Sequence, residues 1–469
     1  MSPRPRHRRS AATQLRGLGY LAVWALLVVA PFYVVFTANE PFRLPKLLAA
    51  EWLGLASLLA LALAAAFRGE DRADPALPGW RRPAFLAVAP VLAVASLGLV
   101  ASSHPEHTRQ ALPDLWIAGS CLVGWSLALD AGRLRRLLRW LPLPAALMAG
   151  LGVLQFHGVF QPFRFLGGVH NYRLGVTSLA GNAGDLAAYL VLPGLVAQWR
   201  LLETLAGPDA PRGRRHWLRA GSWAFVLIAI LYGIAATQSL TPAAALAAGS
   251  AVFWLATLPV RRALTAVVAG AIVLATLVAG VPELRERLAG VGRLLAQNQL
   301  NAALTGRLDG WNAALWMVKE HPWTGVGHGA YRAEFGTAKL ALQNRGVEFF
   351  EGHTDPFFAN AHNDLLEAAA EWGLPGVAAL AWGLWVLGRS VIGQGARTRA
   401  PEGARASRRA GTEAPGGDGR GGRPFALAGT AAALLLALGQ FPFHLALVAY
   451  PFLVFLAWVF RQADPEVEP

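Results

Sequence analysis

The sequence contains few groups that could form covalent cross-links or a charged surface. It has a single cysteine, Cys121, inside an apolar run, which excludes a disulfide framework and a cysteine-based metal site. Only 15% of the residues are charged, whereas 55% are hydrophobic. This balance is too apolar for an ordinary soluble enzyme and indicates a multi-pass membrane protein.

Lysine is scarce, so the formal net charge of +14 comes almost wholly from arginine. In a soluble protein such a charge would suggest a nucleic-acid partner. In a membrane protein it more often reflects arginines that hold loops on the cytoplasmic side, and we expect no nucleic-acid partner here. The arginine-rich N-terminus precedes an apolar run over 18–38 that is too long for the core of a signal peptide. We therefore interpret that run as a retained first span.

The apolar residues are grouped into segments that match the thickness of a bilayer. A membrane-spanning helix needs about 20 mostly apolar residues. The chain has twelve such candidates, and the segment with Gln198 and Arg200 near one end is among the least apolar: 18–38, 47–67, 84–102, 114–131, 137–157, 185–203, 219–237, 241–258, 263–281, 368–388, 425–440 and 445–460. The predicted fold class is an all-α integral membrane protein of about twelve helices.

The arginines predict the orientation. With the N-terminus in the cytoplasm, the cytoplasmic segments hold 29 of the 42 Lys and Arg residues. The other side holds 13, of which eight lie in one long loop, 282–362. Because long loops follow the charge rule poorly, the fair comparison is 29 against five in the short loops. Twelve spans with both termini in the cytoplasm satisfy this rule.

This topology divides the chain into seven parts. Two cytoplasmic tails and a cytoplasmic low-complexity linker alternate with blocks of spans and one long, helical periplasmic loop between helices 9 and 10. The boundaries are the tail 1–17, helices 1–9 in 18–281, the loop 282–362, helix 10 in 363–388, the linker 389–424, helices 11–12 in 425–460 and the tail 461–469. No free nucleotide donor is available outside the cytoplasm. An enzyme of this loop must therefore use a donor already activated and moved across the membrane, or catalyse hydrolysis.

Polar residues that can do chemistry gather in 301–376. Residues 282–297 predict an amphipathic helix on the bilayer surface, in which Arg285 or Arg287 could meet lipid phosphates. Residues 305–320 predict a second helix, with Thr305 as its N-cap and an apolar stripe of Leu308, Trp311, Leu315 and Val318. Arg307 would then project beside a positive helix end, an arrangement suited to phosphate.

A third helix is predicted from His362 to about Trp372, ended by Gly373 and Pro375, with His362, Leu365, Leu366 and Ala369 on one face. An imidazole at a helix start near the membrane boundary can accept a proton from a hydroxyl nucleophile, with Asn363 and Asp364 as orienting partners. A capping or interfacial histidine is the alternative.

The remaining segments of the loop predict structure more than chemistry. Gly325, Gly327 and Gly329 predict a tight turn around His328, not a nucleotide loop. Residues 337–361 lack periodicity and could form a lid. His353, Asp355 and His362 could bind a metal, but their spacing matches no strong metal pattern.

Several motifs of this segment resemble one family. They are Arg307-x3-Trp311, His321-Pro322-x2-Gly325-x-Gly327, and His362-Asn363-x3-Leu366 followed by Glu371-x-Gly373-Leu374-x-Gly376. Weaker similarities are Pro45-Lys46, Thr177-x3-Gly181-Asn182 and Ala236-Thr237-Gln238-Ser239. Together they resemble the O-antigen ligase and O-antigen polymerase superfamily of bacterial membrane glycan transferases.

The resemblance implies transfer of a glycan from a polyprenyl-diphosphate carrier to a sugar hydroxyl, on a lipid A core or on another glycan, at the periplasmic face of the bacterial inner membrane. It implies that His362 is the base, that Arg307 binds the donor diphosphate, and that neither a nucleotide nor a metal cofactor is needed. Further candidates for substrate contact are Asn363, Arg332, His321, Gln238 and Asn182.

The sequence departs from the family at one point. Family members commonly have Ser-Arg-Gly after the seventh span, and that arginine is also thought to meet the diphosphate. Here the run is Gln238-Ser239-Leu240-Thr241-Pro242. Another cation, such as Arg332, Arg173 or Arg164, could take its place.

Two other classes of function stay open. A transporter of lipid or glycan usually carries ionisable groups within its spans, which here hold few, chiefly Glu51. A non-catalytic member of a cell-envelope assembly is compatible with the missing arginine. Among enzymes, the motifs do not separate a ligase from a polymerase or a protein-directed oligosaccharyltransferase.

Overall fold

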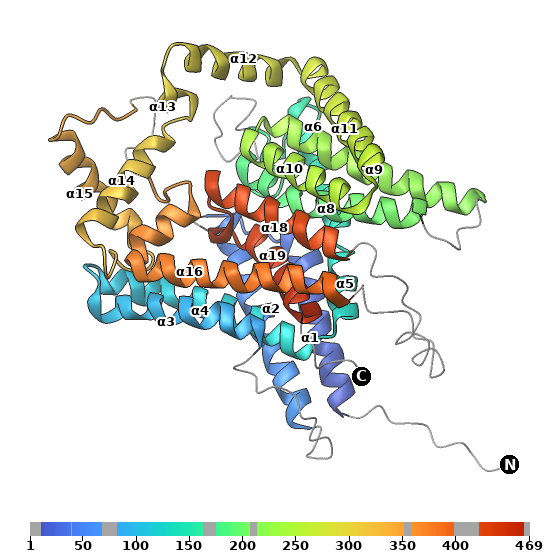
Figure 1. The fold of residues 1–469 in the computed structure, drawn as a ribbon, viewed down its shortest axis with the longest axis horizontal. Coiled ribbons are helices and arrows are strands. Elements are labelled where there is room, and N and C mark those ends of the chain that lie inside the picture. Colours follow the sequence, from blue (N-terminus) through green and yellow to red (C-terminus); the bar gives the residue numbers. More distant parts are fainter. Residues whose placement is uncertain are drawn as a thin grey trace.

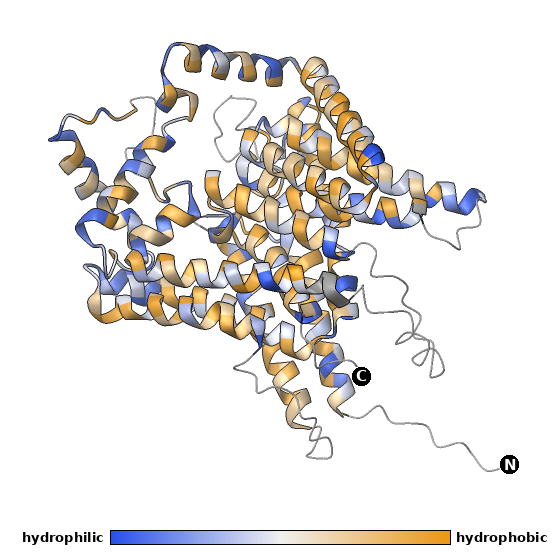
Figure 2. Cartoon of the chain, in the orientation of Figure 1, coloured by the Kyte–Doolittle hydropathy of each residue, from blue (hydrophilic) through white to orange (hydrophobic). Residues whose placement is uncertain are grey.

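The computed structural model describes residues 11–38, 40–67, 82–162, 175–206, 213–350, 358–397 and 422–463. All regular structure in these ranges is helical. Eleven of the described helices are long and apolar enough to cross a membrane. Most of the bundle is apolar along its length, whereas polar residues gather in the segments around α12–α15 and at the helix ends (Figure 2). The chain is thus an all-α, multi-pass membrane protein.

The first half of the chain forms pairs of neighbouring helices. The helices are α1 (Ala11–Val28), η1 (Ala30–Phe32), α2 (Arg43–Ala66), α3 (Pro83–Ala101), α4 (Pro105–Ala128), α5 (Ala131–Leu138) and α6 (Pro142–Phe156). The first span, Ala11–Phe32, begins and ends earlier than the predicted 18–38, and Pro31 lies in the short helix η1 at its end. The predicted span 137–157 is divided, because Pro142 and Pro144 follow the amphipathic helix α5.

The helix α8 (Ala183–Ala206) occupies the predicted span 185–203 but is not among the eleven apolar helices. Every residue from Asp185 to Trp199 is buried. Neighbouring helices enclose α8, so a polar side chain can be satisfied by protein. Gln198 donates a hydrogen bond to Ser250 Oγ at 2.7 Å and accepts one from Trp254 at 3.1 Å. An enclosed helix needs less apolar character than one that faces lipid.

After α9 (Arg214–Thr237), α10 (Leu240–Thr257) and α11 (Val260–Gly280), the chain leaves the bundle. The helix α12 (Pro282–Ala296) lies across the top in Figure 1, and α13 (Leu300–Ala303) and α14 (Arg307–Glu320) descend from it toward the bundle. The helix α15 (Tyr331–Gln343) covers part of the segment predicted to be an aperiodic lid. That expectation was wrong for 337–343, and residues 351–357 lie outside the described residues.

The chain returns to the bundle through α16 (Asp364–Arg397), which runs beside α3 (Figure 1). Gly373 interrupts this helix with φ 64° and ψ −164°, as expected from the Gly-x-Pro sequence. The last helices are α18 (Gly422–Gly439), η4 (Pro442–His444) and α19 (Ala446–Ala463), and α19 packs in the core.

The loops sort onto two ends of the bundle. At one end Glu203 pairs with Arg135, Arg139 and Arg200, which join connections assigned to the cytoplasm by the arginine count. The connections assigned to the other side contact one another elsewhere, for example through Arg43 and Asp185 at 2.8 Å. Each of these two sets of contacts joins connections that the arginine count assigns to one side.

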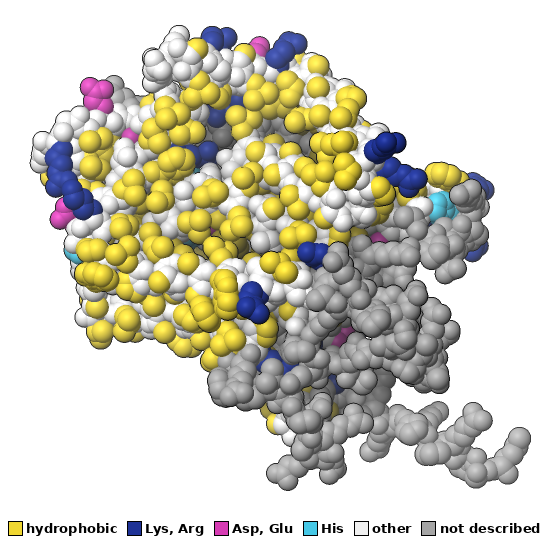
Figure 3. Space-filling model, viewed as in Figure 1, with side chains coloured by type: hydrophobic (Ala, Val, Ile, Leu, Met, Phe, Trp, Pro, Cys, Tyr) yellow, Lys and Arg dark blue, Asp and Glu magenta, His cyan; other side chains and the backbone are white. Residues whose placement is uncertain are grey.

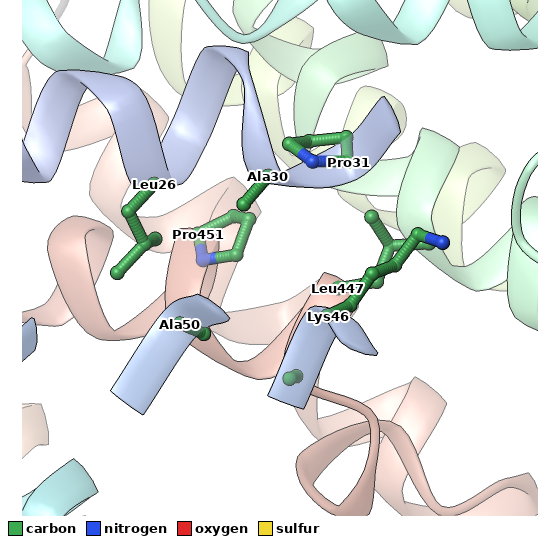
Figure 4. A pocket seen from close by; sticks show the side chains of 8 residues that line it. Leu26, Ala30, Pro31, Lys46, Ala50, Leu447 and Pro451 are labelled. Atoms are coloured by element: carbon green, nitrogen blue, oxygen red, sulfur yellow. The ribbon is translucent and has the colours of Figure 1, made fainter. Parts of the chain in front are cut away.

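Beside this second end, Lys46 closes the turn between α1 and α2. Its Nζ donates to the carbonyls of Tyr33 at 3.0 Å and Phe42 at 2.9 Å. A small, mainly apolar pocket adjoins it, with Leu26, Ala50 and Pro451 in its wall (Figure 4). Lys46 thus has a structural role that explains the Pro45-Lys46 motif.

Candidate functional site

The start of α16 is fixed by Asn363. The side-chain oxygen of Asn363 accepts hydrogen bonds from the N–H groups of Leu365 and Leu366, both at 3.1 Å. This is an N-cap, so the helix begins at Asp364, two residues later than predicted. His362 therefore stands outside the helix, and the predicted helical face shared by His362, Leu365, Leu366 and Ala369 was wrong.

His362 has a left-handed backbone, with φ 55°. Its half-buried ring lies between Phe358 and Phe441, with ring centroids 5.8 and 4.8 Å away. A positive φ is uncommon for a residue other than glycine and persists only where the surroundings hold it. The neighbouring residues must therefore fix the position of this imidazole.

Two contacts hold Ala361, the residue before His362. Glu367 accepts a hydrogen bond from the Ala361 N–H at 2.7 Å, and its other oxygen accepts one from Asn360 at 2.9 Å. On the opposite side, Gly310 of α14 packs so closely that a β-carbon there would lie 3.1 Å from the Ala361 carbonyl oxygen. The backbone at His362 is thus set by a buried carboxylate and by the packing of α14.

A row of buried carboxylates follows His362. Asp364, Glu367 and Glu371 are spaced by three and four residues, so they share one face of α16, and each is at most 8% exposed. Buried carboxylates need partners. Glu371 lies 3.0 Å from Nδ1 of His328, and its other oxygen accepts the Tyr331 N–H at 3.3 Å. The sequence analysis missed this row, although its spacing was readable.

The partner of the other two carboxylates is His444, from the turn between α18 and α19. Its Nδ1 lies 3.0 Å from Asp364 and its Nε2 lies 3.3 Å from Glu367. Burial lowers the pKa of His444, but Glu367 and Asp364 outweigh burial and raise that pKa above its usual value. His444 is therefore held as a cation, and it fixes the turn that carries Phe441 against His362.

Arg307 is the first residue of α14. The N-cap is Gly306, with φ 79° and no side-chain cap, so the predicted N-cap Thr305 was wrong; Thr305 instead has φ 56°. The guanidinium of Arg307 donates to Thr241 Oγ1 of α10 at 3.4 Å. Burial lowers the pKa of Arg307, and the charge of Arg287 on α12 lowers it further. The side chains of Arg307 on α14 and Arg287 on α12 are therefore close enough for their charges to interact.

The buried face of α14 differs from the predicted stripe. The buried residues are small or polar, namely Asp309, Gly310, Ala313 and Ala314 together with Met317, whereas Leu315 is 55% exposed. Asp309 accepts hydrogen bonds from Asn301 at 2.7 Å and from the Phe350 N–H at 2.9 Å. Small residues allow α14 to approach the backbone before His362 closely, and this requirement outweighed hydrophobic periodicity.

The glycine turn after α14 joins it to α16. Gly325, Gly327 and Gly329 all have positive φ, as predicted for a tight turn. The N–H groups of Val326 and Gly327 donate to the carbonyls of Ala370 and Glu371 at 3.0 and 2.9 Å. A β-carbon at Gly325 would lie 2.2 Å from the Glu371 carbonyl oxygen, so only glycine fits. The turn therefore holds the C-terminal end of α14 against α16 at Ala370 and Glu371.

Residues 224–381 match the family model described as O-antigen ligase. This segment of the chain is similar to the O-antigen ligase superfamily. The match covers α9 to the first part of α16, and therefore includes Arg307, His362 and the row of carboxylates. No curated protein matches the chain significantly.

Within this O-antigen ligase segment, the connection between α9 and α10 lacks the expected arginine. Gln238 caps α9 with φ 53° and is buried, and Thr241 is the residue that contacts Arg307. Of the suggested replacements, Arg164 and Arg173 lie outside the described residues, and Arg332 is exposed on α15. Arg287, which the sequence analysis considered only for lipid phosphates, is the cation that acts on Arg307.

The other predicted site residues lie at helix ends. Asn182 accepts the Gly184 N–H at 2.7 Å at the start of α8. His321 follows the last residue of α14, and a helix of 14 residues places it about 20 Å from Arg307. His353 and Asp355, considered as metal ligands, lie outside the described residues.

Proposed function

We propose that this protein transfers a glycan from a polyprenyl-diphosphate carrier to a sugar hydroxyl on the outer side of the cytoplasmic membrane, with both termini in the cytoplasm. The observation that carries the proposal is the contact between the helix of Arg307 and the backbone before His362. An anion-binding group and a proton acceptor are thereby held by two elements packed against each other.

In the proposed reaction the acceptor oxygen attacks the anomeric carbon of the donor glycan. Its proton passes to His362, and the bond between the anomeric carbon and the diphosphate oxygen breaks. The diphosphate leaves on its lipid carrier with the bonding electrons. An imidazole is a suitable group to accept this proton.

The leaving group gains negative charge as its bond breaks, so cations placed beside it lower the barrier. Arg307 and Arg287 are the cations proposed for this role. No carboxylate lies within salt-bridge distance of either guanidinium among the described residues, and Nε of Arg287 is buried without a hydrogen-bond partner there. Lys and Arg side chains face the recess beneath α12 in Figure 3. Two partly buried like charges repel each other, and a diphosphate between them would remove that cost.

Arg287 would thus replace the arginine that the family commonly has after the seventh span. It comes from the amphipathic helix α12, which lies across the end of the bundle. Thr241 at the original position holds Arg307 by a hydrogen bond but brings no charge. The second arginine at the diphosphate would then come from the external loop and not from the bundle, and the diphosphate would still have two arginine partners.

Deletion of the gene, followed by gel analysis of surface glycan, tests the proposal. Loss of long chains with single repeats still attached to their acceptor would indicate a polymerase. Full-length polymer left on the lipid carrier would indicate a ligase acting on a lipid A core or another acceptor. An unchanged surface glycan and an unchanged pool of lipid-linked glycan would refute glycan transfer.

A further inference from the structure

A group of metal-ligating side chains lies at the start of α4, away from the residues assigned to glycan transfer. His104, Glu106 and His107 each offer one ligand atom, and these atoms lie within 4.8 Å of one another. Nδ1 of His104 is 4.0 Å from a Glu106 oxygen, and the rings of His104 and His107 are 5.8 Å apart. The 4.0 Å between the His104 nitrogen and the Glu106 oxygen exceeds the spacing of about 3.4 Å between ligand atoms of a tetrahedral zinc ion, so one side chain would have to move inward.

Glu106 is free to make that movement. Its side chain is 62% exposed, and within the described part of the chain its one ionic contact is the distant Nδ1 of His104. A change of side-chain rotamer can carry its carboxylate toward the two imidazoles at small cost. The two histidines are partly buried at the helix start and need move less.

The orientation of His104 is the second observation. Its Nε2 lies 2.7 Å from Glu334 of α15, whose side chain is 10% exposed. A carboxylate can only accept a hydrogen bond, so the contact with Glu334 favours the form of His104 in which Nε2 carries the proton. Nδ1 then presents its lone pair toward Glu106. A carboxylate behind a histidine is the usual outer partner of a metal-bound imidazole.

We propose that His104, Glu106 and His107 bind one divalent transition-metal ion such as Zn²⁺, oriented by Glu334. Two imidazoles and a carboxylate suit zinc and its neighbours and do not suit calcium or magnesium, which prefer oxygen ligands. Three protein ligands leave one position for water. All three ligands lie at the start of α4, so the ion would act on the external loop only by holding His104 in place for its contact with Glu334 of α15.

The surrounding contacts fit this role. The glycine turn docks on the same part of α4: a β-carbon at Gly327 would lie 2.6 Å from Ser102 and Thr108. Ser103 donates to the Val326 carbonyl at 3.4 Å. Metal binding would strengthen a docking interface that otherwise rests on these contacts and the bond from His104 to Glu334.

The test is metal uptake by the full-length protein in detergent micelles, purified with a tag that contains no histidine. After removal of metal with a chelator, the protein is dialysed against buffered Zn²⁺, and bound zinc is measured by mass spectrometry. We expect about one ion per chain for the wild type. H107A and E106Q should lose this ion, and E334Q should bind it 10–100-fold more weakly.

H216A is the matched control, since His216 on α9 is also partly buried but, among the residues that the structure describes, has no acidic neighbour within salt-bridge distance. It should keep the wild-type stoichiometry. Elution as a single species in size-exclusion chromatography verifies that the H107A and E106Q variants fold. Absence of saturable uptake by the wild type, or equal uptake by H107A and the wild type, would overturn the proposal.

Discussion

Gly310 on α14 packs directly against the carbonyl of Ala361, and a β-carbon on Gly310 would lie only 3.1 Å from that oxygen. Gly310 comes one turn after Arg307, and Ala361 directly precedes His362. This contact joins the two groups to which the proposed reaction assigns the diphosphate and the proton. The reaction therefore depends on a position where one methyl group already crowds the structure, which leads to the first prediction.

The substitution G310A should reduce glycan transfer by moving α14 away from His362. Crowding of a well-packed position typically costs about 1–3 kcal/mol, so the thermal midpoint should fall as well. The matched control is G292A on α12, where a β-carbon meets nothing within 4 Å. It should be neutral or stabilising by about 0.5–1 kcal/mol. Transfer and thermal unfolding of both variants check this, and equal behaviour would contradict it.

H362A should abolish transfer while leaving the protein folded, because the ring is partly exposed and meets Phe358 and Phe441 edge-on. Removal of a general base typically costs about 10²–10⁴-fold in rate. H157A serves as a control: His157 lies at the end of α6 and contacts Tyr232. Full activity in H362A would remove His362 from the proposed chemistry.

The two arginines should act together on the donor. R307A and R287A should each weaken transfer by about 10–100-fold, since a hydrogen bond to a charged group contributes about 1.5–3 kcal/mol. R307K should not restore activity, because lysine lacks the planar fork that binds phosphate oxygens. The double variant should lose less than the sum of the two singles. Strict additivity, or an effect of R307A alone, would show that Arg287 does not share the diphosphate.

The ion pairs of His444 predict a pH dependence of stability. Its pKa is raised from 6.5 to about 10 in the folded protein by Glu367 and Asp364, against the lowering effect of burial. A raised pKa stabilises the folded state fully below the unfolded value, and this stabilisation is lost as the pH rises toward 10. The size of this stabilisation is reduced by solvent screening, since the His444 side chain is 37% exposed.

Thermal unfolding between pH 6 and pH 10 measures this effect. The midpoint of the wild type should fall across that range, and the fall should be smaller for H444Q, which cannot lose a proton. Parallel pH profiles for the two proteins would mean that His444 does not contribute as a cation.

The sequence determined the fold class and the segment to which we assign the proposed chemistry, because both depend on local composition. Apolar runs of bilayer length predict spans, and the long polar segment 282–362 cannot lie in lipid. The Gly373-x-Pro375 break and the glycine turn followed from backbone conformations that few residues adopt. Motifs within one segment of the sequence predicted His362 and Arg307 as candidate site residues.

Contacts between distant segments could be decided only by the tertiary structure. His444 is 80 residues from Asp364, and no local pattern indicates that it lies between two carboxylates. The most buried face of α14 differs from the predicted stripe, of which Leu315 is exposed while Leu308, Trp311 and Val318 are partly buried, because close approach to Ala361 requires small side chains. Arg287 and Arg307 came together because α12 lies across the bundle end. Such long-range packing has no signature in the spacing of residues along the chain.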